Sequence, residues 1–160
     1  MRSIKFRAWH KKDLVMLNFI TSLHFYTDGI RGWAQCGWNK EKNNATGNFQ
    51  PSDVDLMQYT GLKDKNGKEI YEGDIVCMDD SVAGYPPSIT IKNRKYLGKL
   101  VIVKWANEYG TFEVESIPRF EGDVPGYQNW LHNIFDYKND INTVEVIGNI
   151  YENPELLEEK

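Results

Sequence analysis

Short segments in which apolar and polar residues alternate, separated by glycine and asparagine, run through most of this 160-residue sequence. Between Ser3 and Trp9, for example, Ile4, Phe6 and Ala8 alternate with charged or aromatic residues. That is the two-residue period of a half-buried strand, whereas a helix would place its apolar residues every three or four positions. The pattern predicts a mainly β fold of small antiparallel sheets, α+β at most, with little helix.

The turns between these segments carry their own signals. Asn66-Gly67 is the strongest, because asparagine and glycine both tolerate the positive φ that a tight hairpin turn requires. A short helix is expected over Gln128–Phe135, and Asn153-Pro154 is typical of another helix start, with asparagine as the cap. We expect strands at Ser3–Trp9, Leu14–Phe19, Leu23–Thr27, Val54–Thr60, Ile75–Met78, Ile89–Lys92, Lys99–Trp105, Thr111–Ser116 and Val144–Tyr151.

The composition is that of one ordinary globular domain. With 41% hydrophobic residues, the chain can bury a core without disulfides or metal. The net charge of -4 argues against a dedicated DNA-binding or membrane-surface protein, which usually carries a strong positive excess. The start is basic and the end acidic, which two solvated faces explain; charge steering between the ends of neighbouring subunits is the alternative. The residues concerned are Arg2, Lys5, Arg7, Lys11 and Lys12 at the start, and Glu145, Glu152, Glu155, Glu158 and Glu159 at the end.

The two cysteines, Cys36 and Cys77, form neither a CxxC pair nor a disulfide framework, so reduced thiols in the cytoplasm are expected. The start of the chain carries charges at alternate positions and has no apolar signal region. No apolar run approaches the length that crosses a bilayer. We therefore expect a cytoplasmic protein without a membrane partner.

Three stretches of the sequence resemble a known family. They are IKFRAW from Ile4, QYTGLKDKNGKEIYEGDIV from Gln58 and EVIGNIYENPELL from Glu145, and together they resemble the YopX family of phage and prophage proteins over nearly the whole chain. One departure is His10, which stands where the family commonly has an acidic residue after Trp9. The resemblance implies a mainly β fold with a small SH3-like barrel in the C-terminal part and a phage or prophage gene acting in the host cell. It implies no known activity.

We expect a single YopX-like domain over residues 1–160. A subdivision would separate an N-terminal β region at 1–57, an SH3-like barrel region at 58–153 and a short C-terminal helix or tail at 154–160. In the central motif a tight turn sets strand register, and Asp74 can accept hydrogen bonds from nearby backbone N–H groups. A binding surface on the same loop is the alternative. The motif residues expected to shape the sheet are Tyr59, Gly61, Asn66, Gly67, Tyr71, Gly73 and Asp74.

Chemistry-bearing residues show no recognisable constellation in linear order. The carboxylates of Asp53, Asp55, Glu72 and Asp74 could meet in a metal or acid–base site, but their spacing does not show convergence. The histidines have no metal-ligand spacing, and a pairing of either cysteine with a histidine stays open. These histidines are His10, His24 and His132. We therefore predict no catalytic residues, no cofactor and no metal, and a protein that is not an enzyme.

A nucleic-acid interface is the second possibility, because basic and aromatic residues interleave in one stretch. Single-strand binders combine such residues to neutralise phosphates and to stack bases, although lysines on an exposed hairpin also protect an edge strand. The residues are Lys92, Arg94, Lys95, Tyr96, Lys99, Lys104 and Trp105. Our leading hypothesis is a phage accessory protein that works by protein–protein contact and forms a homo-oligomer, since 13% of its residues are aromatic and interfaces favour tyrosine and tryptophan. A hydrolase with an unrecognised carboxylate site ranks third.

Overall fold

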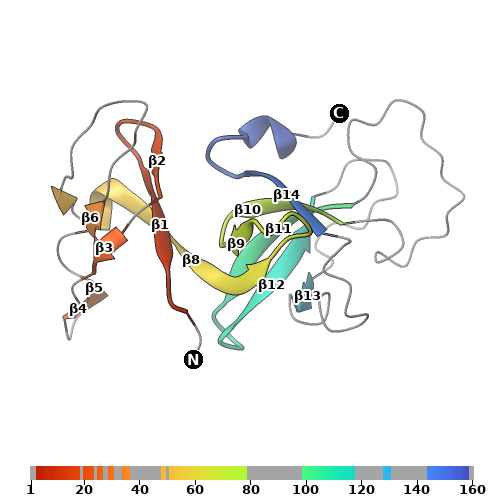
Figure 1. Ribbon diagram of the computed structural model, residues 1–160, viewed down its shortest axis with the longest axis horizontal. Helices are drawn as coiled ribbons and strands as arrows, with labels where there is room; N and C mark the ends of the chain where they lie inside the picture. Colours follow the sequence, from red (N-terminus) through yellow and green to blue (C-terminus); the bar gives the residue numbers. More distant parts are fainter. Residues whose placement is uncertain are drawn as a thin grey trace, which may run out of the picture. The chain divides into compact units, whose positions relative to one another are not determined.

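The computed structural model describes residues 3–18, 20–23, 25–26, 29–30, 34–36, 48–49, 51–78, 99–117, 128–130 and 144–158 (Figure 1). In this part of the chain the regular structure is β-strand, apart from two short 3-10 turns, η1 (Pro51–Asp53) and η3 (Pro154–Leu156). All strand pairs are antiparallel. The prediction of a mainly β fold built from small antiparallel sheets is confirmed. Among these residues no helix is long and apolar enough to cross a membrane.

The chain divides into two compact units, an N-terminal unit of Met1–Tyr59 and a C-terminal unit of Thr60–Lys160. The division falls inside strand β8 (Val54–Lys63), which pairs with β1 (Phe6–His10) through its first half and with β9 (Glu69–Tyr71) through its second. The boundary is therefore a continuous strand.

In the N-terminal unit, β1 is the middle strand between β2 (Val15–Leu17) and β8. The register pairs Ala8 with Leu17 on one side and with Leu56 on the other. Simple alternation would expose Arg7, yet Arg7 and Ala8 are both buried. The Arg7 Nε donates to the Met57 Sδ at 3.4 Å, so the long side chain of the arginine packs into the unit.

The rest of this unit consists of very short strands. Its further strands are β3 (Ile20–Ser22), β4 (Phe25–Tyr26), β5 (Gly29–Ile30), β6 (Ala34–Cys36) and β7 (Asn48–Phe49). Strand β6 lies between β3 and β7, and β4 pairs with β5. Strands β1 and β2 correspond to the strands expected at Ser3–Trp9 and Leu14–Phe19, although β2 is shorter, and they pair as a hairpin, with β3 following β2.

The C-terminal unit contains a curled sheet of five strands in the order β13-β12-β11-β10-β14 (Figure 1). These are β10 (Asp74–Met78), β11 (Lys99–Ala106), β12 (Thr111–Ser116), β13 (Gln128–Trp130) and β14 (Val144–Asn149). Alternate residues of β12 are buried, as a two-residue period requires. Closure of this sheet into an SH3-like barrel stays a prediction.

Two hydrophobic clusters hold the C-terminal unit together. The larger one collects buried valines from four strands around Ile70, Met78 and Phe112. The smaller one is built on Ile75, Leu100 and Ile117. Leu156 and Leu157, just after β14, pack against the smaller cluster half-buried. The two clusters keep the strands of the hairpins in register, because a one-residue slip would turn their apolar side chains outward.

Two sequence expectations need correction or refinement. The expected helix over Gln128–Phe135 is wrong at its start, since residues 128–130 form strand β13 and pair with β12; residues 131–135 lie outside the described residues. Pairing with β12 determines the structure of residues 128–130, because three residues are too few for their own periodicity to distinguish helix from strand. The helix expected to start at Asn153-Pro154 is a single 3-10 turn, η3. Pro lies at its first position as expected, but the Asn153 side chain does not cap it. The expected strand at Ile89–Lys92 also lies outside the described residues.

Candidate functional site

The central motif forms the hairpin of β8 and β9, and a buried carboxylate organises its turn. Asp64 Oδ1 accepts hydrogen bonds from the backbone N–H groups of Asn66 and Lys68, both at 2.8 Å. Gly67 has a φ of 79°, in the left-handed region that glycine enters without steric cost. The turn thus combines an Asx-type hydrogen bond with the glycine that its backbone requires.

The same aspartate ties the turn to the neighbouring sheet. Asp64 Oδ2 accepts a hydrogen bond from the Val146 N–H at 3.0 Å, and the Lys65 N–H donates to the Val144 carbonyl at 2.9 Å. The Lys65 ammonium lies 2.6 Å from the Glu145 carboxylate. That hydrogen bond raises the pKa of Lys65 from its ordinary value of 10.5. The turn therefore satisfies backbone groups of β14 that would otherwise lie at the edge of the five-stranded sheet.

The second half of the motif also holds backbone. Asp74 Oδ2 accepts a hydrogen bond from the Tyr71 N–H at 2.8 Å, the kind of contact that the sequence predicts. Gly73, with a φ of 77°, donates its N–H to the Val103 carbonyl and accepts from the Ile150 N–H. The Tyr71 hydroxyl donates to Glu69 at 2.9 Å. These contacts join the motif to the rest of the C-terminal unit.

Tyr59 and Gly61, two further residues of the motif, lie within strand β8. Tyr59 is buried, and the Lys5 ammonium lies 5.4 Å from the centre of its ring, within range of a cation–π contact. Gly61 has a φ of 92° and lies within β8. Thr60, between them, donates its hydroxyl to the Ile70 carbonyl at 2.8 Å. The side chains of Thr60, Asp64 and Asp74 are thus engaged with backbone groups.

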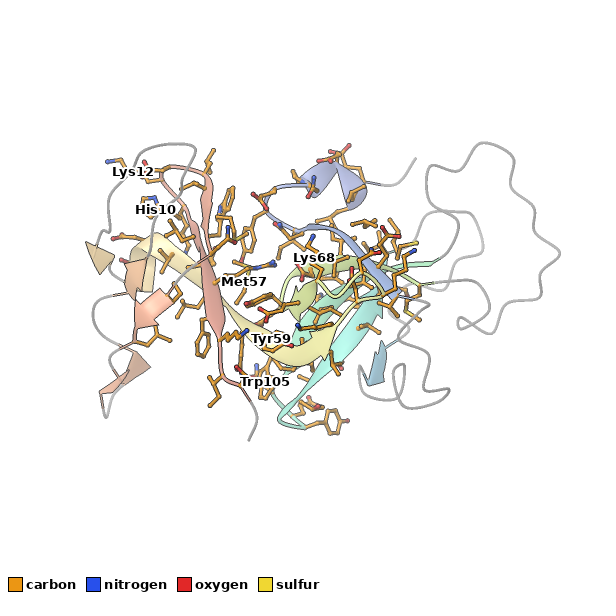
Figure 2. The ribbon with its side chains drawn as sticks, in the orientation of Figure 1. His10, Lys12, Met57, Tyr59, Lys68 and Trp105 are labelled. Carbon is orange, nitrogen blue, oxygen red and sulfur yellow. The ribbon has the colours of Figure 1, made fainter. Side chains whose placement is uncertain are left out.

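The turn between β1 and β2, where Figure 2 labels His10 and Lys12, is a second fixed hairpin turn, and it exposes an apolar side chain. Leu14 is 66% exposed and has a φ of 51°. It is the one residue other than glycine with a positive φ in the described part of the chain. A leucine in the left-handed region is strained, because its Cβ crowds the backbone.

Several contacts hold this turn in place. The buried His10 Nδ1 lies 3.2 Å from the Asp13 N and 3.0 Å from the Asp13 Oδ2. Both contacts use the same ring nitrogen and join the last residue of β1 to the turn. The Lys11 N–H donates to the Asp53 carbonyl at 2.9 Å, and the Lys11 ammonium pairs with Asp55 at 2.8 Å.

The four carboxylates considered as a metal or acid–base site are divided between the two units. Asp53 is exposed in η1 and Asp55 pairs with Lys11, both in the N-terminal unit. In the C-terminal unit, Glu72 is half-buried and Asp74 bonds the backbone. Among the described residues, no group of three or more His, Cys, Asp or Glu side chains could hold a metal ion.

The other candidates for chemistry are the cysteines, which lie in different strands, and the histidines, two of which lie outside the described residues. Cys36 ends β6, and Cys77 is half-buried in β10, in the rim of the smaller cluster. His24 and His132 lie outside the described residues. The pairing of a cysteine with a histidine therefore stays an untested hypothesis.

The basic stretch proposed for nucleic acid is described only at its end. Lys92, Arg94, Lys95 and Tyr96 lie outside the described residues, and Lys99 begins β11. The last two candidates, on the hairpin of β11 and β12, have partners. Lys104 pairs with Glu115, and the register places Glu113 directly opposite it. Trp105 packs half-buried against the larger cluster and meets the Phe112 ring edge-on, with centroids 4.9 Å apart.

The tip of this hairpin exposes an aromatic side chain. Tyr109 is 64% exposed. The Ala106 carbonyl accepts hydrogen bonds from the N–H groups of Tyr109 at 3.2 Å and Gly110 at 2.9 Å, and Gly110 has a φ of 63°. Within the described residues, each unit thus carries an exposed, large hydrophobic side chain on a hairpin turn whose backbone is fixed.

Comparison with known proteins places the chain in a family. The family profile described as YopX protein matches residues 5–158, nearly the whole length. The chain belongs to the YopX family. Among solved structures, the YopX chain is similar to the crystal structure of protein EF1440 from Enterococcus faecalis, with a TM-score of 0.57 and 27% identity. The match covers 99% of this chain and 100% of the other. No curated protein matches it.

Charge in this YopX chain divides along the boundary between its two units. Residues 1–59 contain 8 Lys and Arg against 5 Asp and Glu, a net charge of +3. Residues 60–160 contain 11 against 18, a net charge of -7. Opposite charge on two units attracts the unlike ends of separate molecules, an effect that salt screens.

Proposed function

We propose that this YopX-family protein works by binding other proteins, copies of itself included, and catalyses no reaction. The observation that carries the proposal is the pair of exposed side chains on fixed turns, Leu14 and Tyr109. The proposed setting is the cytoplasm of a host cell that carries the phage or prophage.

Fixed turns suit this role for an energetic reason. Binding loses free energy to the ordering of side chains and loops, so contact residues on backbone that is already ordered lose less of it. Tyrosine is also enriched at the residues that contribute most to protein interfaces. Tyr109 meets both conditions, because two hydrogen bonds to the Ala106 carbonyl fix the backbone beneath it.

The contacts of the central motif support the same proposal. Asp64 and Asp74 accept backbone hydrogen bonds, and Asp64 is almost fully buried. Carboxylates in that role define strand register and turn geometry. We therefore assign the motif to folding and the exposed turns to recognition.

The experiment is affinity purification with quantitative mass spectrometry from host cells that carry the phage, with the tagged full-length chain as bait. A variant with Leu14→Ser and Tyr109→Ser serves as the matched bait, since both substitutions replace exposed side chains. We expect specific partners with the original chain and their loss with the variant. Identical recovery by both baits would contradict the proposed role of the turns.

Binding of single-stranded DNA or RNA is tested in parallel by fluorescence anisotropy at low and high salt. The proposal predicts no specific binding, because Lys104 pairs with Glu115 and Trp105 is packed against the core. Tight binding that weakens steeply with salt would instead establish the nucleic-acid alternative.

A further inference from the structure

The turn between β1 and β2 has a chemistry that folding alone does not explain. Leu14 occupies a backbone conformation that glycine or asparagine adopts more easily, and it exposes an apolar side chain there. Strained residues persist where the surrounding structure holds them, and they often belong to sites of recognition or catalysis. Here His10 and Lys11 supply the contacts that hold the turn.

The surroundings of Leu14 define which partner would fit. Lys12 is exposed and projects from the outer end of the turn (Figure 2), whereas Lys11 pairs with Asp55 and the Asp13 carboxylate lies against His10. The surface thus offers one apolar side chain beside the ammonium of Lys12. Its complement is an acidic segment that presents leucine.

The end of the same chain has that chemistry. Glu152, Glu155 and Glu158 are exposed in the described part of the C-terminal segment. Leu156 and Leu157 pack against the smaller cluster but are only half-buried, so part of each side chain stays accessible. The segment is also held in one conformation, because the Asn149 side chain accepts the N–H groups of Tyr151 and Glu152 and donates to the Glu152 carboxylate at 2.6 Å.

We infer that the β1–β2 turn of one copy binds the C-terminal segment of a second copy, with Leu14 against Leu156 and Leu157 and with Lys12 beside Glu155 and Glu158. The inference rests on the proposed function, of which it names one partner and one surface. The contact joins the +3 unit of one molecule to the -7 unit of the next. Because it uses two different surfaces, it is head-to-tail, and it closes into a ring or extends into a filament.

The test is sedimentation velocity of the full chain over a wide concentration range, at low and high salt. We expect the mass to rise above that of one chain with concentration and to fall with salt. Leu14→Asn should raise the dissociation constant about ten-fold or more and also raise the melting temperature, because it removes the contact and relieves the strain. A substitution that merely damaged the fold would lower the melting temperature.

Two further variants separate the contact from general exposure. Ile4→Ser replaces a side chain that is 72% exposed but outside the turn, and it should leave association unchanged. Lys12→Glu should weaken association, and mixing it with a chain that carries Glu155→Lys and Glu158→Lys should restore it between the two variants.

An original chain that keeps the mass of one molecule at every concentration would overturn the inference. So would a Leu14→Asn chain that associates as tightly as the original. Neither result would touch the proposed binding of other proteins, which their recovery by the tagged chain tests separately, although a chain that stays monomeric would also remove self-association from the proposed function.

Discussion

Two of the hairpin turns among the described residues, β8–β9 and β1–β2, solve the same problem with different residues. Between β8 and β9, the left-handed position is held by Gly67, with a φ of 79°, and a buried aspartate accepts the surrounding N–H groups. Between β1 and β2, the left-handed position is held by Leu14, with a φ of 51°, and the acceptor is His10 at 3.2 Å. In the first turn, the residue at the left-handed position adopts that conformation without steric cost. In the second turn, the residue at that position is strained by it.

The contrast between Gly67 and Leu14 separates residues that shape the fold from residues that face a partner. Where local preference and tertiary structure agree, folding alone explains the choice of residue. Where they disagree, as at Leu14, the conflict marks a position to test for function. Each turn has a substitution that should move its stability in a known direction: Gly67→Ala introduces strain into the first turn, and Leu14→Asn relieves it in the second.

The largest expected effect belongs to Asp64. Asp64→Ala leaves three backbone N–H groups without their charged acceptor, and hydrogen bonds to charged groups contribute about 1.5–3 kcal/mol each. We expect unfolding free energy to fall by about 3–5 kcal/mol, measured by urea denaturation. Asp64→Asn, which keeps one carbonyl oxygen and the shape, should cost clearly less. Equal losses in the two variants would show that packing, and not hydrogen bonding, dominates.

Gly67→Ala should have the next largest effect. A Cβ at this position would meet no atom within 4 Å, so the cost comes from the positive φ alone. We expect a loss of about 1–2 kcal/mol in the free energy of unfolding. Lys68→Ala, at the exposed neighbouring position, is the control and should change stability by less than about 0.5 kcal/mol. A neutral Gly67→Ala would remove the contrast between the two turns.

Leu14→Asn should move stability in the opposite direction. Asparagine enters the left-handed region more easily than leucine, so we expect a gain of about 0.5–1 kcal/mol in urea denaturation. Leu14→Ala removes the same exposed side chain but keeps a Cβ at a positive φ, and it should leave stability nearly unchanged. A loss of stability in the asparagine variant would mean that the leucine side chain contributes to the fold.

The smallest effect concerns Lys65 and alkaline pH. Its hydrogen bond to Glu145 raises the pKa of Lys65 in the folded chain above 10.5. The stabilisation is therefore complete below that pH and is lost as pH rises through the folded pKa. Lys65→Met should flatten the fall in stability above pH 10.5, measured by urea denaturation across that range. Lys68→Met, on the same turn, should keep the original slope.

Much of the strand pattern could be predicted, since most of it is local. Alternation identified β1, β11 and β12, and Asn66-Gly67 identified the turn between β8 and β9. The contact of Asp74 with backbone followed from the habits of short acidic side chains in turns. Asp64 was missed, although an aspartate two residues before Asn-Gly is itself a turn signal.

What could not be predicted depends on partners distant in sequence. Strand β13 exists because residues 128–130 pair with β12, and no periodicity in three residues reveals that. The second bond of Asp64 reaches Val146, 82 positions away. The left-handed backbone of Leu14 was not predicted: Leu14 was expected to begin a strand over Leu14–Phe19, whereas β2 begins at Val15 and its pairing with β1 leaves Leu14 in the turn.

The continuity of β8 has a practical consequence. Its residues Tyr59 and Thr60, on either side of the division between the units, are both buried within paired backbone. Proteases cleave where the chain is exposed and locally unfolded, so limited digestion should not release the two halves at this point. Fragments meant to isolate either half would each need the whole strand, from Val54 to Lys63, and the same ten residues would then serve twice.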